Sequence, residues 1–392
     1  MSTGDTSTSR NEPGSRFIWR VLLKAALLFL LINLLFALCD SIPALGRVTA
    51  YNHLFPGRAR LPYGENPEKS YNLSLFDLDA MFASHEIASG EKPSGEYRVI
   101  LIGDSSTWGF LLKPGETLSA ALNQANYSLP DGRRVRFYNL GYPVMSLMKD
   151  LLVLSRAQQY DPDLIVWPFT LESFPYDKQL YPPLLQHNPT PIQELIGEYQ
   201  LNLDAQDPNF IRASTWDRTL IGSLRALADW WRLQLYGVMW AATGLDQDIP
   251  AEYTSRLEDL PSDEGFHNLH PPHLREDDLA LEILQAGARL AGDTPILFIN
   301  EPMFISRGQN SDIRYNFYYP RWAYDDYRRI MQEQSSRQGW NYADLWDAIP
   351  PEEFTNTAVH LSPEGNRLLA RKILPLVNEI IEFGALDRRP GE

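Results

Sequence analysis

Cysteine is almost absent from this sequence, because Cys39 is the only one among 392 residues. A single cysteine excludes an intramolecular disulfide, so cysteine content neither supports nor excludes export from the cytoplasm. Basic residues are also scarce: 35 lysines and arginines stand against 50 aspartates and glutamates, for a formal net charge of -15. This balance argues against nucleic acid, an anionic bilayer surface or an acidic polymer as the partner, since each favours a clustered positive face.

Histidine is infrequent as well, with seven residues in the chain. His267, His270 and His273 recur at a spacing of three in a proline-containing segment, which would align them on one face of an extended left-handed helix. No carboxylate or cysteine stands at a spacing typical of a zinc motif. We therefore predict a solvated loop here and no metal site, and the sequence gives no sign of a cofactor.

A long apolar run lies near the start of the chain. Residues 1–15 are polar and are expected to form a disordered tail. The next residues, 16–39, are nearly all apolar, and about twenty such residues suffice for a helix to cross a bilayer. Between Phe17 and Leu38 the polar interruptions are Arg20, Lys24 and Asn33. We predict a transmembrane anchor over residues 16–39.

The charges around this run predict its orientation. Arg16, Arg20 and Lys24 gather at its N-terminal end and Asp40 follows it, so the short tail is expected in the cytoplasm and the rest outside. A cleaved signal peptide is the competing interpretation, with a small-residue site ending at Ala50. That site lies about ten residues beyond the apolar run, which is far for cleavage. We favour an uncleaved, single-pass anchor, and both interpretations export the domain.

Short apolar runs alternate with helical patterns through most of the remaining chain, whose composition is 44% hydrophobic. The expected strands are residues 97–102, 135–139, 163–168, 295–300 and 340–345. The expected helices are residues 115–126, 145–160, 276–290, 324–338 and 363–383. This alternation predicts an α/β fold, a three-layer α/β/α sandwich around a central parallel five-stranded sheet. In such sheets ligands bind beyond the carboxyl ends of the strands.

The other segments complete the expected domain organisation. Residues 40–95 carry proline, glycine and asparagine and are predicted to form a lead-in segment on the surface of a domain over 96–383. Residues 174–274 interrupt the alternation, contain four tryptophans and are predicted to form a helical insertion. Its aromatic side chains are expected to pack against one another and the core, with a lid at the substrate groove or membrane interface as the alternative. Residues 384–392 form a tail.

Ser105 follows the first expected strand in the triplet Gly103-Asp104-Ser105. A serine on a strand-to-helix turn presents its hydroxyl above the carboxyl edge of the sheet, beside the N–H groups of the helix start. The same triplet also caps helices in proteins that have no catalytic activity. His360 favours the catalytic interpretation, because it precedes the last helix on that same edge and a serine nucleophile needs a base.

Three blocks occur in a recognisable order along the chain. They are Gly103-Asp104-Ser105-Ser106-Thr107-Trp108-Gly109, then Asn139-Leu140-Gly141, and finally His360-Leu361-Ser362-Pro363-Glu364-Gly365. This order resembles the SGNH (GDSL-like) hydrolase superfamily, whose members are esterases, lipases and carbohydrate O-acyl hydrolases or transferases. The resemblance implies a flavodoxin-like fold, Ser105 as nucleophile and His360 as base. It also implies an oxyanion hole formed by the N–H groups of Ser105 and Gly141.

The sequence departs from the family pattern at the residue that orients the histidine. The family places an acidic residue three positions before the histidine, where this chain has Thr357, next to Asn356. An asparagine carbonyl can accept from the imidazole Nδ1–H and fix its tautomer, so Asn356 is the first candidate. Asp344 and Asp347, after the fifth strand, are alternative acids, and a Ser-His dyad assisted by a backbone carbonyl is a further arrangement.

A second departure concerns the oxyanion hole. The family's Gly-x-Asn-Asp block corresponds to residues 169–173, which contain no asparagine. Thr170 or Ser173 is then a substitute donor, or the hole has two donors only. We therefore predict a membrane-anchored, extracytoplasmic serine esterase acting on a small-molecule or glycan O-acyl ester. The alternatives are an O-acyltransferase for cell-surface glycans and a catalytically degenerate carbohydrate-binding domain.

Overall fold

The computed structural model describes most of the chain after the first 13 residues. The described residues are 14–39, 42, 45, 50, 54–55, 78–83, 85–212, 214–245 and 257–387. Most of the expected polar tail over 1–15, the first part of the expected lead-in segment and residues 388–392 of the expected C-terminal tail therefore lie outside the described residues.

A five-stranded, all-parallel sheet forms the centre of the domain, in the order β2-β1-β3-β4-β5. The strands are β1 (Glu96–Gly103), β2 (Arg134–Gly141), β3 (Leu164–Phe169), β4 (Ile296–Asn300) and β5 (Asn341–Asp344). The predicted α/β fold with five parallel strands is confirmed. Since the chain changes direction across the sheet between β1 and β3, the crevice beyond their carboxyl ends is the expected ligand position.

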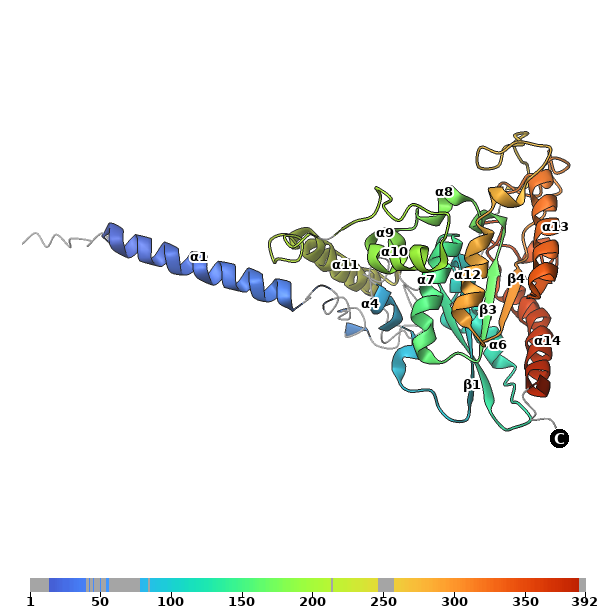
Figure 1. Ribbon diagram of the computed structural model, residues 1–392, viewed down its shortest axis with the longest axis horizontal. Helices are drawn as coiled ribbons and strands as arrows, with labels where there is room; N and C mark the ends of the chain where they lie inside the picture. Colours follow the sequence, from blue (N-terminus) through green and yellow to red (C-terminus); the bar gives the residue numbers. More distant parts are fainter. Residues whose placement is uncertain are drawn as a thin grey trace, which may run out of the picture.

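Helices cover this sheet and extend beyond it (Figure 1). They are α1 (Ser15–Leu38), α4 (Leu78–Ala83), α5 (Ser105–Trp108), α6 (Leu118–Gln124), α7 (Leu147–Ala157), α8 (Tyr176–Gln179), α9 (Pro183–His187), α10 (Pro189–Tyr199), α11 (Leu224–Thr243), α12 (Leu281–Ala291), α13 (Arg321–Gln338) and α14 (Pro363–Asp387). Short 3-10 turns are η1 (Glu86–Ser89), η2 (Pro114–Glu116), η3 (Gln158–Tyr160), η4 (Leu171–Ser173), η6 (Glu276–Asp278) and η7 (Pro351–Glu353).

Two apolar cores lie on opposite faces of the sheet. Alternate residues of β1 serve each core: Ile100 and Ile102 belong to the one with α7, α12 and α13, whereas Val99 and Leu101 belong to the one with α6 and α14. Every residue of β1 is buried, as expected for a parallel strand covered on both faces. The three layers place the carboxyl ends of β1, β2 and β3 at one edge, where polar side chains can meet.

The expected helical insertion divides into two parts of different character. Helices α9 and α10 contribute buried residues such as Leu184, Leu185 and Ile192 to the core on the α7 side. Helix α11 begins only at Leu224, because the residues before it, from Trp216 onward, form a turn. Its aromatic side chains pair with one another but stay largely exposed, as Trp231 does at 60%.

Helix α1 extends away from the central sheet, as Figure 1 shows in blue. It is 24 residues long, and almost all its side chains are exposed. Asn33 is its single buried side chain within the described residues. By length and composition α1 can cross a membrane, as either an anchor or a signal sequence does.

Candidate active site

A glycine ends β1 and turns the chain toward α5. At Gly103 a Cβ atom would lie 2.5 Å from Oγ1 of Thr107 and 3.2 Å from the carbonyl oxygen of Pro168, so no larger residue fits. Asp104 then caps α5, since its Oδ1 accepts a hydrogen bond of 2.7 Å from the backbone N–H of Ser106. The turn leaves Ser105 half-buried as the first residue of α5.

Ser105 and His360 meet across this edge of the sheet. The Oγ atom of Ser105 lies 2.8 Å from Nε2 of His360, although 255 positions separate the two residues in the sequence. His360 is only 7% exposed, and the ring of Phe110 packs against its imidazole with 4.9 Å between ring centroids. A serine hydroxyl within hydrogen-bond reach of a shielded imidazole is the arrangement that nucleophilic catalysis requires.

Asn356 orients the other side of the imidazole. Its Oδ1 atom lies 3.0 Å from Nδ1 of His360 and also accepts a 3.2 Å hydrogen bond from the hydroxyl of Thr355. The loop is closed by the N–H of Thr355, which donates to the carbonyl of His360 over 2.8 Å, while the N–H of His360 donates to Oγ1 of Thr357. With an acceptor at Nδ1, the proton resides there and Nε2 is free to accept from Ser105.

The two aspartates named from the sequence as alternative acids lie elsewhere. Asp344, at the end of β5, receives hydrogen bonds of 2.8 Å from Asn300 and from Arg328. Neither Asp344 nor Asp347 hydrogen-bonds with His360 in the described part of the chain. The alternatives Asp344 and Asp347 are therefore wrong as partners of the ring in this structure: the sequence placed them near the correct sheet edge, but Arg328 of α13 holds Asp344 there.

Burial sets the protonation state of His360. The pKa of His360 is lowered below its ordinary value chiefly because burial disfavours the charged imidazolium, and the nearby charge of Asp104 partly offsets this. The imidazole is therefore neutral at neutral pH and able to accept a proton.

The predicted oxyanion donor at Gly141 is engaged in the structure. Its backbone N–H donates a hydrogen bond of 2.9 Å to Oδ1 of Asn139 instead of facing open space. The N–H of Ser105, by contrast, makes no hydrogen bond within the described residues. Thr170, a candidate substitute donor, is fully buried beside the phenols of Tyr319 and Tyr324. Ser105 thus offers the available backbone donor, and Gly141 becomes one only if Asn139 releases it.

A buried lysine, which was not predicted from the sequence to have a role, donates hydrogen bonds to the backbone beside the Gly103–Ser105 turn. Nζ of Lys149, in α7, donates to the carbonyl oxygens of Gly103 and Tyr142 over 2.6 and 2.8 Å, and it pairs with Asp150 at 2.6 Å. Burial raises the pKa of Asp150 to about 6, even though Lys149 opposes this shift. Lys149 therefore links the last residue of β1 to the residue that follows β2. Its position in an otherwise apolar helical pattern was the available signal.

A buried glutamate lies on the other side of the turn. Glu301 directly follows β4, and its Oε2 accepts a hydrogen bond of 2.5 Å from the hydroxyl of Ser106. Burial, and after it the charge of Asp104, raise the pKa of Glu301 well above its usual range, because both disfavour the charged carboxylate. Sequence reasoning missed Glu301, although a charged residue at the carboxyl end of a buried strand was visible.

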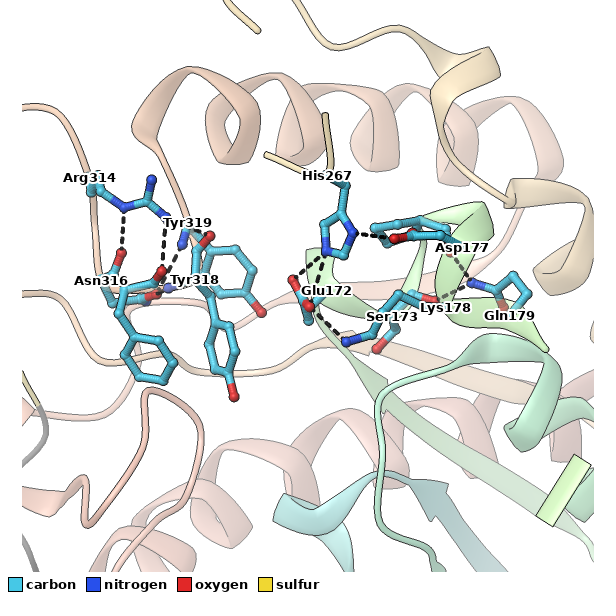
Figure 2. Close-up of polar contacts among 12 residues, drawn as sticks. Glu172, Ser173, Asp177, Lys178, Gln179, His267, Arg314, Asn316, Tyr318 and Tyr319 are labelled. Carbon is cyan, nitrogen blue, oxygen red and sulfur yellow. Dashed lines mark hydrogen bonds and ion pairs between the residues drawn. The ribbon is translucent and has the colours of Figure 1, made fainter. Parts of the chain in front are cut away.

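A second polar cluster lies at the same sheet edge, after β3 (Figure 2). Nε2 of His267 lies 3.1 Å from Glu172 and its Nδ1 lies 2.9 Å from Asp177, while Lys178 pairs with Glu172 at 2.8 Å. Burial lowers the pKa of His267, but its hydrogen bonds with these two carboxylates outweigh that effect and raise it overall. The predicted solvated loop is thus wrong for His267, because its side chain is only 19% exposed and lies between the carboxylates of Glu172 and Asp177.

The other two histidines of that segment do not join the cluster. The imidazole of His273 is 77% exposed and faces Asp326 instead, and His270 is exposed as well. Within the residues that the structure describes, no group of histidine, cysteine and acidic side chains is arranged to hold a metal ion.

Tyr318 lies near enough to both Glu172 of this cluster and Asp104 of the turn before α5 for their charges to act on its phenol. Asn316 positions the segment, since its Oδ1 accepts hydrogen bonds from the N–H groups of Tyr318 and Tyr319 over 2.9 and 3.2 Å (Figure 2). Burial raises the pKa of Tyr318 to about 12, and the charges of Glu172 and Asp104 add to that shift. The phenol of Tyr318 is therefore neutral and lies close enough to both carboxylates to sense their charges.

Comparisons with known proteins give structural neighbours only. No family model matches the sequence, and no curated protein matches it. Among solved structures, the chain is similar to a member of the lipolytic protein G-D-S-L family from Veillonella parvula, at 11% identity over 71% of this chain and 96% of that chain, with a TM-score of 0.33. It is similar also to a carbohydrate acetylesterase family member from Sinorhizobium meliloti, at 13% identity over 73% and 99%, with a TM-score of 0.31.

Proposed function

We propose that the protein is a serine esterase in which Ser105 attacks the carbonyl carbon of an O-acyl ester. The observation that carries this proposal is the 2.8 Å distance between Oγ of Ser105 and Nε2 of a buried, neutral His360. Attack would transfer the hydroxyl proton to Nε2 while the new C–O bond forms, giving a tetrahedral oxyanion beside the N–H of Ser105. Collapse would expel the alcohol, which takes the proton from the imidazolium, and leave an acyl-enzyme.

Water would then hydrolyse the acyl-enzyme, with water as the nucleophile and Ser105 as the leaving group. His360 accepts a proton from the attacking water, the ester to Ser105 breaks, and the proton returns to Oγ as the carboxylic acid leaves. Asn356 holds the ring through both half-reactions, because its carbonyl oxygen accepts from Nδ1–H at 3.0 Å. An amide stabilises the imidazolium less than a carboxylate does, so a slower esterase than an aspartate-containing one is expected.

The proposed setting is the outer side of a membrane. Helix α1 would be the single-pass anchor, with its basic N-terminal end in the cytoplasm and the domain outside. The substrate class would be small-molecule or glycan O-acyl esters. If a sugar hydroxyl instead of water accepts the acyl group, the same intermediate serves an O-acyltransferase.

A fluorophosphonate probe tests the nucleophile in the full-length protein purified in detergent. We expect the wild type to be labelled and Ser105→Ala to be unlabelled. Ser106→Ala is the matched control, because it removes the neighbouring hydroxyl, which donates to Glu301 and not to His360. No labelling of a folded wild type would contradict the esterase and favour the degenerate carbohydrate-binding alternative.

Turnover of p-nitrophenyl acetate then separates hydrolysis from transfer. For a hydrolase, the rate of p-nitrophenol release is unchanged by added glycans, and free acetate accumulates in equal amount. For a transferase, candidate glycans raise that rate and carry the acetyl group, which mass spectrometry detects.

A further inference from the structure

A compact turn precedes α11 and exposes a tryptophan. The carbonyl oxygen of Trp216 accepts hydrogen bonds from the N–H and the hydroxyl of Thr219 over 2.9 and 2.7 Å. Ser223 closes the turn, since its hydroxyl donates to the carbonyl of Asp217 over 2.6 Å. At Gly222 a Cβ atom would lie 2.0 Å from the carbonyl oxygen of Trp216, so the chain folds back tightly here. The turn is thus built by its own hydrogen bonds, yet the side chain of Trp216 is 60% exposed.

The same turn is hydrogen-bonded to the apolar helix α1. The N–H of Ile221 donates to Oδ1 of Asn33 over 3.1 Å, and Nδ2 of Asn33 donates within the helix to the carbonyl of Phe29 over 2.9 Å. The turn covers Asn33, which is only 8% exposed. The turn therefore supplies a hydrogen-bond donor to the side-chain amide of Asn33. This contact fixes the position of the turn along α1 at the level of Asn33.

The position of Asn33 along α1 gives the depth of the turn. Asn33 lies five residues before Leu38, the last residue of α1, which is about 7–8 Å along the axis at 1.5 Å per residue. A 24-residue helix is about 36 Å long, against a hydrocarbon core of about 30 Å. A spanning α1 therefore places Asn33 within a few ångströms of the boundary between hydrocarbon and headgroups.

We propose that the turn from Trp216 to Leu224 is inserted in the outer interfacial layer of the bilayer that α1 spans. Trp216 and Leu224, at 60% and 57% exposure, would be the inserted side chains, and tryptophan favours this layer. The occupant is a lipid surface held by apolar insertion, because a net charge of -15 disfavours electrostatic attraction to anionic lipids. This inference rests on the proposed membrane anchor and adds a second contact that fixes how the domain is oriented on the membrane.

The rest of α11 supplies a comparison within the same helix. Figure 1 shows α11 leading from the neighbourhood of α1 toward the body of the domain. Met239, near its far end, is 59% exposed, almost as much as Trp216. Because it lies fifteen residues beyond Leu224 in this helix, about 22 Å along the axis, it is expected to stay in water.

Site-specific fluorophores test the proposal in the full-length protein reconstituted in phosphatidylcholine vesicles. Cys39→Ser provides a background without cysteine, and Trp216→Cys, Leu224→Cys, Met239→Cys, Tyr181→Cys and Leu31→Cys each receive an environment-sensitive NBD label. Tyr181 is 63% exposed and lies in the insertion before α9, so it reports bulk water. Spin-labelled lipids added to the vesicles quench labels that touch lipid.

We expect the labels at 216, 224 and 31 to shift their emission to the blue and lose most of their intensity to the lipid quencher, and those at 239 and 181 to keep both. A quenched label at 31 with unquenched labels at 216 and 224 overturns the inference and leaves the anchor intact. A blue-shifted but unquenched label at 216 indicates cover by protein and overturns it too. An unquenched label at 31 removes the anchor and this inference together.

A variant that keeps the native surface gives an independent measurement. Brominated phosphatidylcholine is expected to quench the tryptophan fluorescence of the wild type by a larger fraction than that of Trp216→Phe. Equal fractions in the two proteins would contradict insertion of Trp216.

Discussion

Nδ1 of His360 lies 3.0 Å from Oδ1 of Asn356, so an amide stands where a serine hydrolase ordinarily has a carboxylate. The amide supplies the acceptor that fixes the tautomer but no charge to stabilise the imidazolium. In the proposed esterase the contribution of Asn356 is therefore to position the imidazole, and substitutions at this residue separate the effect of position from that of charge.

Asn356→Ala is expected to lower kcat by roughly 10- to 100-fold, because one hydrogen bond to a group that becomes charged is worth about 1.5–3 kcal/mol. Asn356→Asp keeps the acceptor and adds a negative charge, which raises the pKa of His360 and moves the acid limb of the kcat/KM profile to higher pH. Ester turnover across a pH series measures both effects. An acid limb that stays in place in Asn356→Asp would show that residue 356 does not face the catalytic imidazole.

Removing the charge of Asp104 is expected to move the acid limb of the kcat/KM profile in the opposite direction, to lower pH. Asp104 raises the pKa of His360, so Asp104→Asn lowers it further and moves the acid limb to lower pH. Asparagine still caps a helix, which preserves the hydrogen bond from Ser106 at the start of α5. The kcat/KM profile of this variant checks the direction, and a shift to higher pH would be inconsistent with the geometry.

Gly141 is expected to tolerate no side chain. A Cβ atom there would lie 2.4 Å from the backbone nitrogen of Trp108, so Gly141→Ala must displace α5 and costs about 1–3 kcal/mol or more, with loss of ester turnover. Gly197→Ala is the matched control, because nothing lies within 4 Å of its Cβ position inside α10. Alanine there should stabilise by about 0.5–1 kcal/mol. Denaturant unfolding of both variants measures the contrast, which is refuted if the two shifts have the same sign.

Lys149 is expected to be the costliest buried charge to remove. Lys149→Met leaves the buried Asp150 without its ion-pair partner and removes one donor from each of the carbonyls of Gly103 and Tyr142, and breaking such a pair costs about 3–5 kcal/mol. Arg329→Met, which breaks an exposed pair with Glu333 on α13, should cost less than about 1 kcal/mol. Urea unfolding compares them, and similar midpoints would show that Lys149 contributes no more than a surface residue.

His85 is expected to make the fold acid-sensitive. Both its ring nitrogens are buried and have no hydrogen-bond partner among the residues that the structure describes, and burial lowers its pKa from 6.5 to about 4. The unfolded chain therefore binds a proton more readily, so stability is full above pH 6.5 and is lost as pH falls toward 4. By linkage, about 2 kcal/mol is lost at pH ~5.

His85→Leu removes this titration. The difference in unfolding free energy between the wild type and His85→Leu should move in favour of the variant by that amount between pH ~7.5 and pH ~5. Chemical denaturation at the two pH values measures it. A difference that does not change with pH would mean that His85 is accessible to protons in the folded state.

The sequence predicted the fold well because its signals were local. Runs such as Val99 to Ile102 are apolar on both faces of β1, and this alone distinguishes a covered parallel strand. The meeting of Ser105 and His360 could also be expected, since each follows or precedes an element whose end lies at the carboxyl edge. Both inferences needed only the order of elements along the chain.

What the sequence could not supply were pairings between side chains from distant elements. Nothing near Gly141 indicates that Asn139 accepts its N–H, and nothing near Glu301 indicates that Ser106 donates to it across 195 positions. His267 was expected in solvent because its segment is polar, but Glu172, in the stretch after β3, bonds with it. Such contacts depend on packing distances of a few tenths of an ångström, which residue order does not encode.

The 255 positions between Ser105 and His360 also matter while the chain is being synthesised and folds. During synthesis Ser105 leaves the ribosome early. His360 follows only after all five strands and most of the helices that cover the sheet have been made. Throughout that interval the hydroxyl has no proton acceptor and is chemically inert toward esters. The Ser105–His360 pair forms only when β1 and the segment leading into α14 have both docked, so under the proposed mechanism an incomplete chain has no activated nucleophile.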